Sequence, residues 1–270
     1  MKYLLLAPAV VLSALFVVWP MAEVISMSMM KQHILGNTWI GFGNYMALLS
    51  DHGFKQAMLN SVGYILLCVP LQVGGALAVT MAASGLSKRW QDFTRFVFYI
   101  PCMAAGMIIA SVWEWIWHRE GPVNWILGTQ INFFGSTPLA VTAISITTAS
   151  VGIGGMTIML LASVLSIDKQ LYDAAKIDGA SDRQIKWRII FPIILPTVWL
   201  IVLLSAIGAP QIIEYVLALA PYEHSATAAY DIYQTAFVMG RYGPASAKAV
   251  ILLIWMMLMA WGKNRLTREA

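Results

Sequence analysis

The sequence contains few charged residues, and this scarcity excludes a soluble globular protein. Asp, Glu, Lys and Arg make up 11% of the 270 residues, whereas soluble domains carry about 25%. Hydrophobic residues reach 59%, and the mean hydropathy is +0.72. A helix that crosses a bilayer needs about 20 apolar residues, and such runs occupy most of the chain. We therefore predict an all-α membrane protein with a single transmembrane domain over residues 1–270.

The sequence also lacks the motifs of common enzymes and cofactor-binding proteins. Its two cysteines, Cys68 and Cys102, are far apart in apolar surroundings, which excludes a disulfide framework or a cysteine metal site. No GxxxxGK[ST] phosphate-binding loop is present, because Gly262-Lys263 is followed by Asn264 and lacks the upstream glycine. HExxH and GxSxG are absent too. We expect that the chain binds no cofactor or metal and is not an enzyme.

The basic residues lie in short clusters between apolar runs, although the net charge is +4 and the pI is near 9.1. This distribution indicates membrane orientation and not a nucleic-acid partner. With the N-terminus in the cytoplasm, the inner group is Lys2, Lys88, Arg89, Arg95, Lys169, Lys176, Arg183, Lys186, Arg188, Lys263, Arg265 and Arg268. The outer group is Lys31, Lys55, Arg119, Arg241 and Lys248. Because basic flanks prefer the cytoplasm, we predict that both termini are cytoplasmic.

Apolar runs predict six spans. They cover about Tyr3–Met30, Leu59–Ala83, Phe96–His118, Leu139–Leu165, Pro196–Leu219 and Pro244–Gly262. The first resembles a signal peptide, with Lys2 ahead of an apolar stretch. No small-x-small cleavage site follows and the apolar character continues to Met30, so we expect it to be retained as a span.

A charged segment, Ser166–Pro196, separates the fourth and fifth spans. It predicts a short helix over Gln170–Asp178 that ends at Gly179, the residue that most readily adopts the left-handed conformation of a helix end. One face of this helix carries Leu171, Ala174, Ala175 and Asp178. Small side chains permit close approach, so this face suggests a docking surface for a partner. A solvated loop is the alternative.

A second helix follows directly. Ser181 and Gln184 have the spacing of a capping box, in which each residue bonds the backbone amide of the other. Pro192 and Pro196 are expected to break or kink this helix where it re-enters the apolar region. Two helices therefore meet at a tight cytoplasmic turn, which we call the elbow.

The elbow contains Asp173-Ala174-Ala175, then Gly179 after three residues, and later Ile189 and Pro192. This series resembles the coupling motif of the permeases of ATP-binding-cassette (ABC) importers, most closely the maltose-type sugar permeases. Asp173 replaces the more usual Glu, and Lys186 stands where an aromatic residue is common. The resemblance implies a coupling loop over residues 166–192 that docks into a cleft of a separate ATPase. The coupling residues would be Leu171, Asp173, Ala174, Ala175, Asp178, Gly179 and Pro192.

Other segments resemble the same family over essentially the whole chain, including GFGNYMALLSDHGFKQAMLNS in the first outer loop and Arg95 with Pro101 at the third span. The resemblance implies the six-helix transmembrane domain of a type I ABC importer in a bacterial inner membrane. The expected partners are two ATPase subunits that bind ATP and Mg²⁺, a second permease that is a different chain, and an extracytoplasmic solute-binding protein. The expected substrate is a carbohydrate: a sugar, an oligosaccharide or a glycerol phosphate.

The fourth span is rich in small and hydroxyl residues. Ser145, Thr148, Gly152 and Gly155 fall on one side at helical spacing. Such a face permits close packing against another helix. The alternative is that Ser145, Thr148 and Gly152 line a path for a polar solute.

Three further residues are candidates for the substrate path. Glu214 and Tyr215 interrupt the fifth span, and an acidic group at membrane depth is costly unless it faces a polar cavity or a partner. Trp113 belongs to a group of tryptophans at the end of the third span. That group is either an interfacial aromatic belt or, in part, the wall of an outer vestibule.

Two other functions compete with the importer. An ion-coupled secondary transporter would use Glu214 as its coupling group, but such proteins often carry internal repeats, and the sequence has none that we recognise. A membrane scaffold without transport would explain the spans and leave the elbow motif unexplained.

Overall fold

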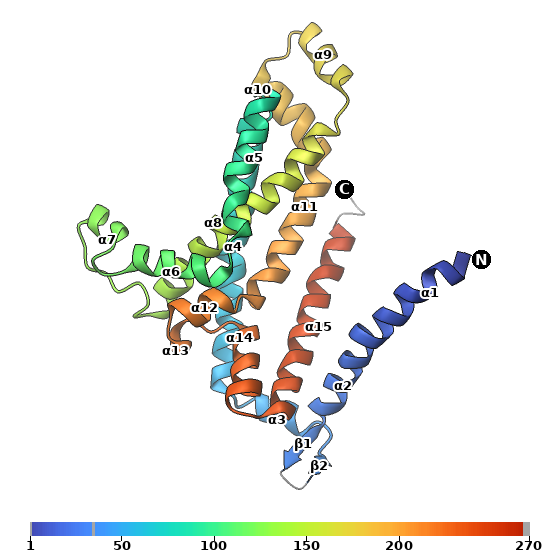
Figure 1. Cartoon of the computed structure of the whole chain (residues 1–270), viewed down its shortest axis with the longest axis vertical. Helices are drawn as coiled ribbons and strands as arrows, with labels where there is room; N and C mark the ends of the chain where they lie inside the picture. The colour runs from blue at the N-terminus through green and yellow to red at the C-terminus, as the bar shows by residue number, and fades with distance from the viewer. Residues whose placement is uncertain (1, 34–35, 267–270) are drawn as a thin grey trace.

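The computed structural model describes residues 2–33 and 36–266 and forms an elongated helical bundle (Figure 1). The long helices of its body are α4 (His52–Ala83), α8 (Thr137–Leu165), α11 (Phe191–Gly208) and α15 (Tyr242–Leu266). The N-terminal helix consists of α1 (Lys2–Ser13), the π-helical η1 (Ala14–Val18) and α2 (Trp19–Ser28). α2 packs against α15, and Figure 1 shows that α1 diverges from α15.

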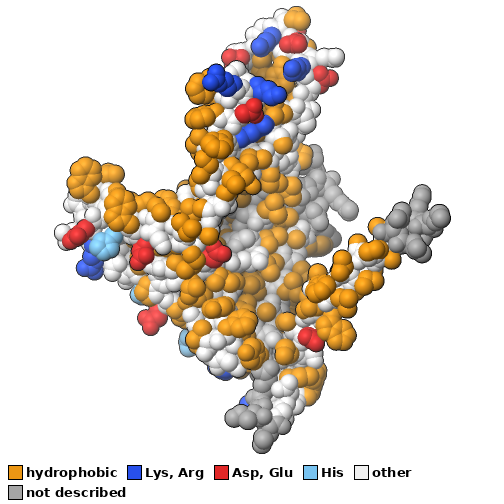
Figure 2. Space-filling view, viewed as in Figure 1, with side chains coloured by type: hydrophobic (Ala, Val, Ile, Leu, Met, Phe, Trp, Pro, Cys, Tyr) orange, Lys and Arg blue, Asp and Glu red, His pale blue; other side chains and the backbone are white. Residues whose placement is uncertain are grey.

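Shorter elements connect the long helices. They are α3 (Gly43–Leu48), α7 (Pro122–Leu127), α9 (Lys169–Ile177), α10 (Asp182–Gln184), the π-helical η2 (Ile185–Ile190), the 3₁₀-helical η3 (Ala209–Gln211), α12 (Glu214–Leu219), α13 (Tyr222–Ser225), α14 (Ala228–Tyr233) and the π-helical η4 (Gln234–Val238). The elbow is α9 and α10, at one end of the molecule (Figure 1). Lys and Arg side chains gather at that end (Figure 2). The predicted inner positions of Lys2, Lys263, Arg265 and Arg268 fall on side chains outside the described part.

Five described helices are long and apolar enough to span a membrane. They cover Leu6–Ser28, His52–Ala83, Thr137–Leu165, Asp182–Gln211 and Tyr242–Gly262. A sixth is obtained when α5 (Lys88–Met103) is counted together with the segment Gly106–Leu127, which begins with α6 (Gly106–Trp117). The predicted total of six is therefore reached with one bent span.

The third span, predicted over Phe96–His118, is sharply bent in the structure. The chain is extended at Ala104 and Ala105, and the segments on either side meet at 95°. α6 packs on α12, where a side chain at Gly106 would collide with the Glu214 carboxylate. This long-range contact sets the direction of α6, and the local apolar pattern does not reveal it.

The fifth span also differs from its predicted range, Pro196–Leu219. It runs over Asp182–Gln211 and ends before Glu214, which starts the separate helix α12. The helix is not broken at Pro192, because the wider turns of η2 directly precede it and Pro192 lies in the first turn of α11. Inside a continuous helix a proline leaves a backbone carbonyl without its usual donor, and an adjoining π-helical turn is a common site for such an irregularity.

The segment between the first and second spans contains a short antiparallel hairpin that the sequence did not predict. β1 (Met30–His33) pairs with β2 (Gly36–Trp39), with Met30 opposite Trp39. The helical fold class is otherwise as predicted.

The core lies between α4 and its neighbours α8 and α11. On the elbow side, Val73 of α4, Leu160 of α8 and Ile194 of α11 belong to one buried apolar cluster. A second cluster lies toward the other end and joins α4, α8, α12 and α14. α4 is therefore the central helix of the bundle.

Candidate functional site

The first helix of the elbow is closed at both ends by local hydrogen bonds. Asp168 caps the start of α9 by accepting from the amide of Gln170 at 2.9 Å. At the other end Gly179 has φ +77°, and the amide of Ala180 donates to the carbonyl of Ala175 at 2.9 Å. This pattern is a Schellman motif, which requires a left-handed residue at the position of Gly179. The predicted helix end is confirmed.

The second helix of the elbow starts with the predicted capping box. The amide of Ser181 donates to Oε1 of Gln184 at 2.8 Å, and the amide of Gln184 donates to Oγ of Ser181 at 3.4 Å. The turn between α9 and α10 is thereby fixed by its own residues. The elbow is a defined structure and not an open loop.

The inner side of the elbow is continuous with the apolar core. Ala175 and Ile185 are buried in the cluster that contains Leu160 and Ile194, and Tyr172 packs against it. A displacement of α9 is therefore resisted by α8 and α11 through close packing. The prediction that Leu171, Ala174, Ala175 and Asp178 share one face of this helix is wrong for Ala175. Ala175 is buried in the protein, whereas the other three residues are exposed.

The outer side of α9 is exposed. Of the predicted coupling residues, Leu171, Asp173, Ala174, Asp178 and Gly179 lie on this side, whereas Pro192 is exposed farther along, on α11. Ile177, which the sequence analysis missed, has 86% of its surface exposed. Leu171 is 47% exposed, so α9 presents two large apolar side chains to solvent beside its charged residues. The sequence pattern that indicates the exposure of Ile177 is an isoleucine between two charged residues, Lys176 and Asp178, at the end of a charged helix.

The predicted path residues of the fourth span lie mainly at a helix interface. Gly152 approaches Gln72 of α4 so closely that a side chain there would lie 2.6 Å from Nε2. Gln72 accepts a hydrogen bond from Ser205 of α11 at 2.6 Å and donates to the carbonyl of Thr148 at 3.4 Å. Ser145 is fully buried. Gly152 and Ser145 thus pack within the bundle, and Thr148 is half-buried.

The other path candidates gather around α6 and α12. Glu214 is exposed beside Gly106, and Tyr215 is half-buried against the second apolar cluster. Trp113 stacks on Trp117 with ring centroids 5.5 Å apart. α8 packs against both α6 and α12. The structure therefore brings together the three elements that carry the candidates, α6, α8 and α12, and both Glu214 of α12 and Glu114 of α6 are exposed.

A buried charge network at the end opposite the elbow was not predicted. Lys248, assigned to the outer surface as a basic residue, is only 3% exposed. Its ammonium contacts the carboxylates of Asp231 at 2.7 Å and Asp51 at 3.0 Å and donates to Thr235 at 2.9 Å. It joins α4, α14, η4 and α15 at one point.

Two groups of this network have shifted pKa values. Burial acts to raise the pKa of Asp51, but the amide of Phe54 and the Lys248 ammonium outweigh it and hold that pKa below its usual value. Burial, with a hydrogen bond to Asp231, raises the pKa of Tyr222. Tyr222 therefore stays protonated and donates to Asp231. Among the described residues, no group of three or more His, Cys, Asp or Glu is placed to hold a metal ion.

A helical membrane domain with a capped, partly apolar elbow between two spans is the architecture of an importer permease. The family described as "Binding-protein-dependent transport system inner membrane component" matches residues 39–269. The chain belongs to this family, and it is a permease subunit of an ABC importer, as the elbow motif predicted. The matches do not support an ion-coupled transporter.

Relatives and a solved structure agree with this assignment. The chain is 27% identical to the sn-glycerol-3-phosphate transport system permease protein UgpA of Agrobacterium fabrum, covering 94% of this chain and 90% of that protein. It is 30% identical to the sulfoquinovosyl glycerol transport system permease protein SmoG of the same organism, covering 92% of this chain and 84% of that protein. A chain of the bacterial alginate ABC transporter, crystallised with its alginate-bound periplasmic protein, superimposes with a TM-score of 0.86 at 20% identity, covering 99% and 94%. That last likeness concerns the fold.

Proposed function

We propose that this permease imports a carbohydrate or a polyol derivative by alternating access, driven by ATP hydrolysis in separate ATPase subunits. Its relatives are named for a glycerol phosphate, a sulfoquinovosyl glycerol and, in a third case, starch degradation products. All are polar, hydroxyl-rich solutes. The observation that carries the proposal is the elbow: a capped helix whose inner side is packed into the core and whose outer side is open.

The elbow transmits the work of the ATPases in this proposal. The complex contains two ATPase subunits, which bind ATP and Mg²⁺, and one of them engages the exposed side of α9, namely Leu171, Asp173, Ala174, Ile177, Asp178 and Gly179. Closure of the two ATPase subunits moves α9. Because Ala175 and Tyr172 are packed against the cluster between α8 and α11, the displacement reaches both spans as a rigid-body shift. Pro192, in the first turn of α11, lies at the start of the helix that follows the motion.

The remaining subunits complete the path. A second permease, which we propose to be a different chain, closes the transport path, and an extracytoplasmic solute-binding protein delivers the substrate. Both termini and the elbow face the cytoplasm. Thr148, Glu214, Tyr215 and Trp113 are the residues of this chain that we propose along the path, while Ser145 and Gly152 position α8 against α4.

Reconstituted vesicles test the proposed function. The complete complex with its binding protein is expected to hydrolyse ATP faster when the correct solute is added, and to accumulate that solute only with ATP. A panel of neutral sugars, oligosaccharides and glycerol phosphates would identify the substrate class. Uptake by the chain alone on an ion gradient, without nucleotide, would overturn the proposal.

The substitution Ile177→Asp is expected to release the ATPase and leave the fold intact. Fully burying an isoleucine side chain contributes about 1.5–3 kcal/mol, so its loss weakens the association by at least about tenfold. The measurement is the amount of ATPase that copurifies with the permease. A matched control is Ile126→Asp on α7, a 73% exposed isoleucine away from the elbow, which should retain the ATPase. Normal ATPase binding and solute-stimulated hydrolysis by Ile177→Asp would contradict docking on this side of α9.

A further inference from the structure

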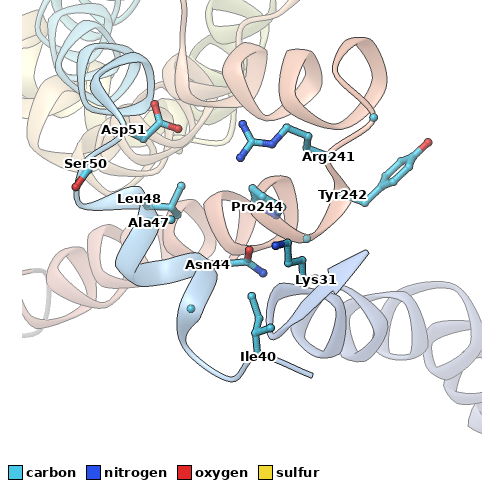
Figure 3. A pocket seen from close by; sticks show the side chains of 13 residues that line it. Lys31, Ile40, Asn44, Ala47, Leu48, Ser50, Asp51, Arg241, Tyr242 and Pro244 are labelled. Carbon is cyan, nitrogen blue, oxygen red and sulfur yellow. The ribbon is translucent and has the colours of Figure 1, made fainter. Parts of the chain in front are cut away.

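The end of the molecule opposite the elbow contains a pocket of about 730 Å³. Its walls come from β1, α3, the residues before α4 and the turn into α15 (Figure 3). Three spans meet there, Leu6–Ser28, His52–Ala83 and Tyr242–Gly262. The lining residues Lys31, Asp51 and Arg241 stand directly beyond the ends of these spans. Residues in such positions lie at the level of the lipid headgroups.

The pocket carries an excess of positive charge. Lys31 and Arg241 reach into the same space on either side of Pro244 (Figure 3). Both side chains are exposed, and neither has an ion-pair partner within residues 2–33 and 36–266. The carboxylate in the lining, Asp51, is already paired with Lys248 at 3.0 Å. Two cationic groups therefore remain available for an anion.

The walls of the pocket are held in place before any ligand arrives. The side-chain amide of Asn44 donates to the carbonyls of Ser28 at 2.8 Å and Met30 at 2.9 Å, which ties α3 to the end of α2 and to β1. A side chain at Gly243 would collide with the carbonyl of Met30, so the start of α15 lies directly against the hairpin. Gly240 has φ +68°, and this left-handed turn leads into Arg241.

The surroundings of the pocket are apolar and open. Phe42 at the N-cap of α3, Met46 within it and Leu49 at its C-cap follow at helical spacing and are 67%, 65% and 63% exposed. On the other side of the pocket, Phe237 is 70% exposed and contacts Tyr242 edge-on. An amphipathic helix with aromatic neighbours at the end of several spans is typical of a surface that sits in the membrane interface.

We propose that this pocket binds the headgroup of an anionic phospholipid. Lys31 and Arg241 contact its phosphate, Arg241 through a paired set of N–H donors. Ser50 and the segment Gly240–Gly243 line the space for the rest of the headgroup. The acyl chains then lie along the exposed faces of α3 and η4. Such a lipid would hold together the ends of the first, second and sixth spans.

Native mass spectrometry of the purified transporter complex tests this site. The probes are phosphatidylglycerol and phosphatidylcholine with identical acyl chains, supplied at equal concentration. Wild-type protein should retain phosphatidylglycerol preferentially. Each basic residue near an anionic lipid contributes roughly fivefold to binding, so Lys31→Gln and Arg241→Gln should each weaken retention by about that factor and the double variant by roughly 25-fold. Lys55→Gln, an exposed lysine of α4 outside the pocket, is the matched control and should behave as wild type.

Four results would overturn the proposal. The first two are equal retention of the two lipids by the wild type and unchanged retention by the double variant. The third is displacement of the lipid by an equal concentration of soluble glycerol phosphate. The fourth is a double variant that keeps its lipid but no longer binds the solute-binding protein. The last would show that the two cations recognise a protein. Thermal unfolding of each single variant in detergent, expected to match the wild type, separates lost binding from lost folding.

Discussion

Replacing Lys248 with methionine is expected to destabilise the protein by about 3–5 kcal/mol, since removing one partner of a buried ion pair leaves an uncompensated charge. Asp231 is 2% exposed, and its carboxylate then keeps only the hydrogen bond from Tyr222. The Lys248 ammonium also lies 5.4 Å from the centre of the Phe54 ring, a cation–π contact that is lost as well. Thermal unfolding of the purified chain in detergent measures the effect.

Two further variants show whether charge is the cause. The double variant Lys248→Met with Asp231→Asn removes both buried charges and should recover part of the lost stability. Lys55→Met removes an exposed lysine from the same end of α4 and should change the free energy of unfolding by less than about 0.5 kcal/mol. Equal destabilisation by Lys248→Met and Lys55→Met would contradict a structural role for the buried network.

The elbow could be predicted from sequence because its structure is local. The capping box is a contact between residues three apart, and the end of α9 depends on the φ angle of Gly179 and on a hydrogen bond between residues five apart. Both signals are legible in a short window. Which residues of α9 face outward could not be read in the same way. The core that buries Ala175 combines α8 and α11, which flank the elbow, with α4, which is distant in the sequence.

The bend between α5 and α6 and the Lys248 network escaped prediction for the same reason. Each depends on a residue far along the chain: Glu214 beside Gly106, and Asp51 and Asp231 around Lys248. Hydropathy treats a charge near the end of a span as interfacial. In the sequence, a buried and paired lysine cannot be distinguished from an interfacial lysine. The signal for Lys248 is its position as a lone charge at the edge of an apolar run, where a charge needs a partner.

Substitution of a glycine in α8 is the second change expected to lower the stability of the protein strongly. Gly152 and Gly155 were expected to share one packing face, but within the described residues no other part of the protein lies within 4 Å of a Cβ atom placed at Gly155. The critical glycine for α5 is Gly154, which is buried and where a side chain would collide with the carbonyl of Phe98 and lie 3.1 Å from Sγ of Cys102. A backbone carbonyl cannot rotate away as a flexible side chain can. α5 must therefore move as a whole.

Gly154→Ala is accordingly expected to lower the free energy of unfolding by about 1–3 kcal/mol through overpacking, and Gly154→Leu by more. Gly155→Ala, one residue along the same helix, is the matched control. It should leave stability unchanged or raise it by up to about 1 kcal/mol, because alanine is the better helix former. Thermal unfolding of both variants in the same detergent measures the difference. If the two alanine variants unfold alike, the close approach of α5 to α8 at Gly154 does not limit the stability of the protein.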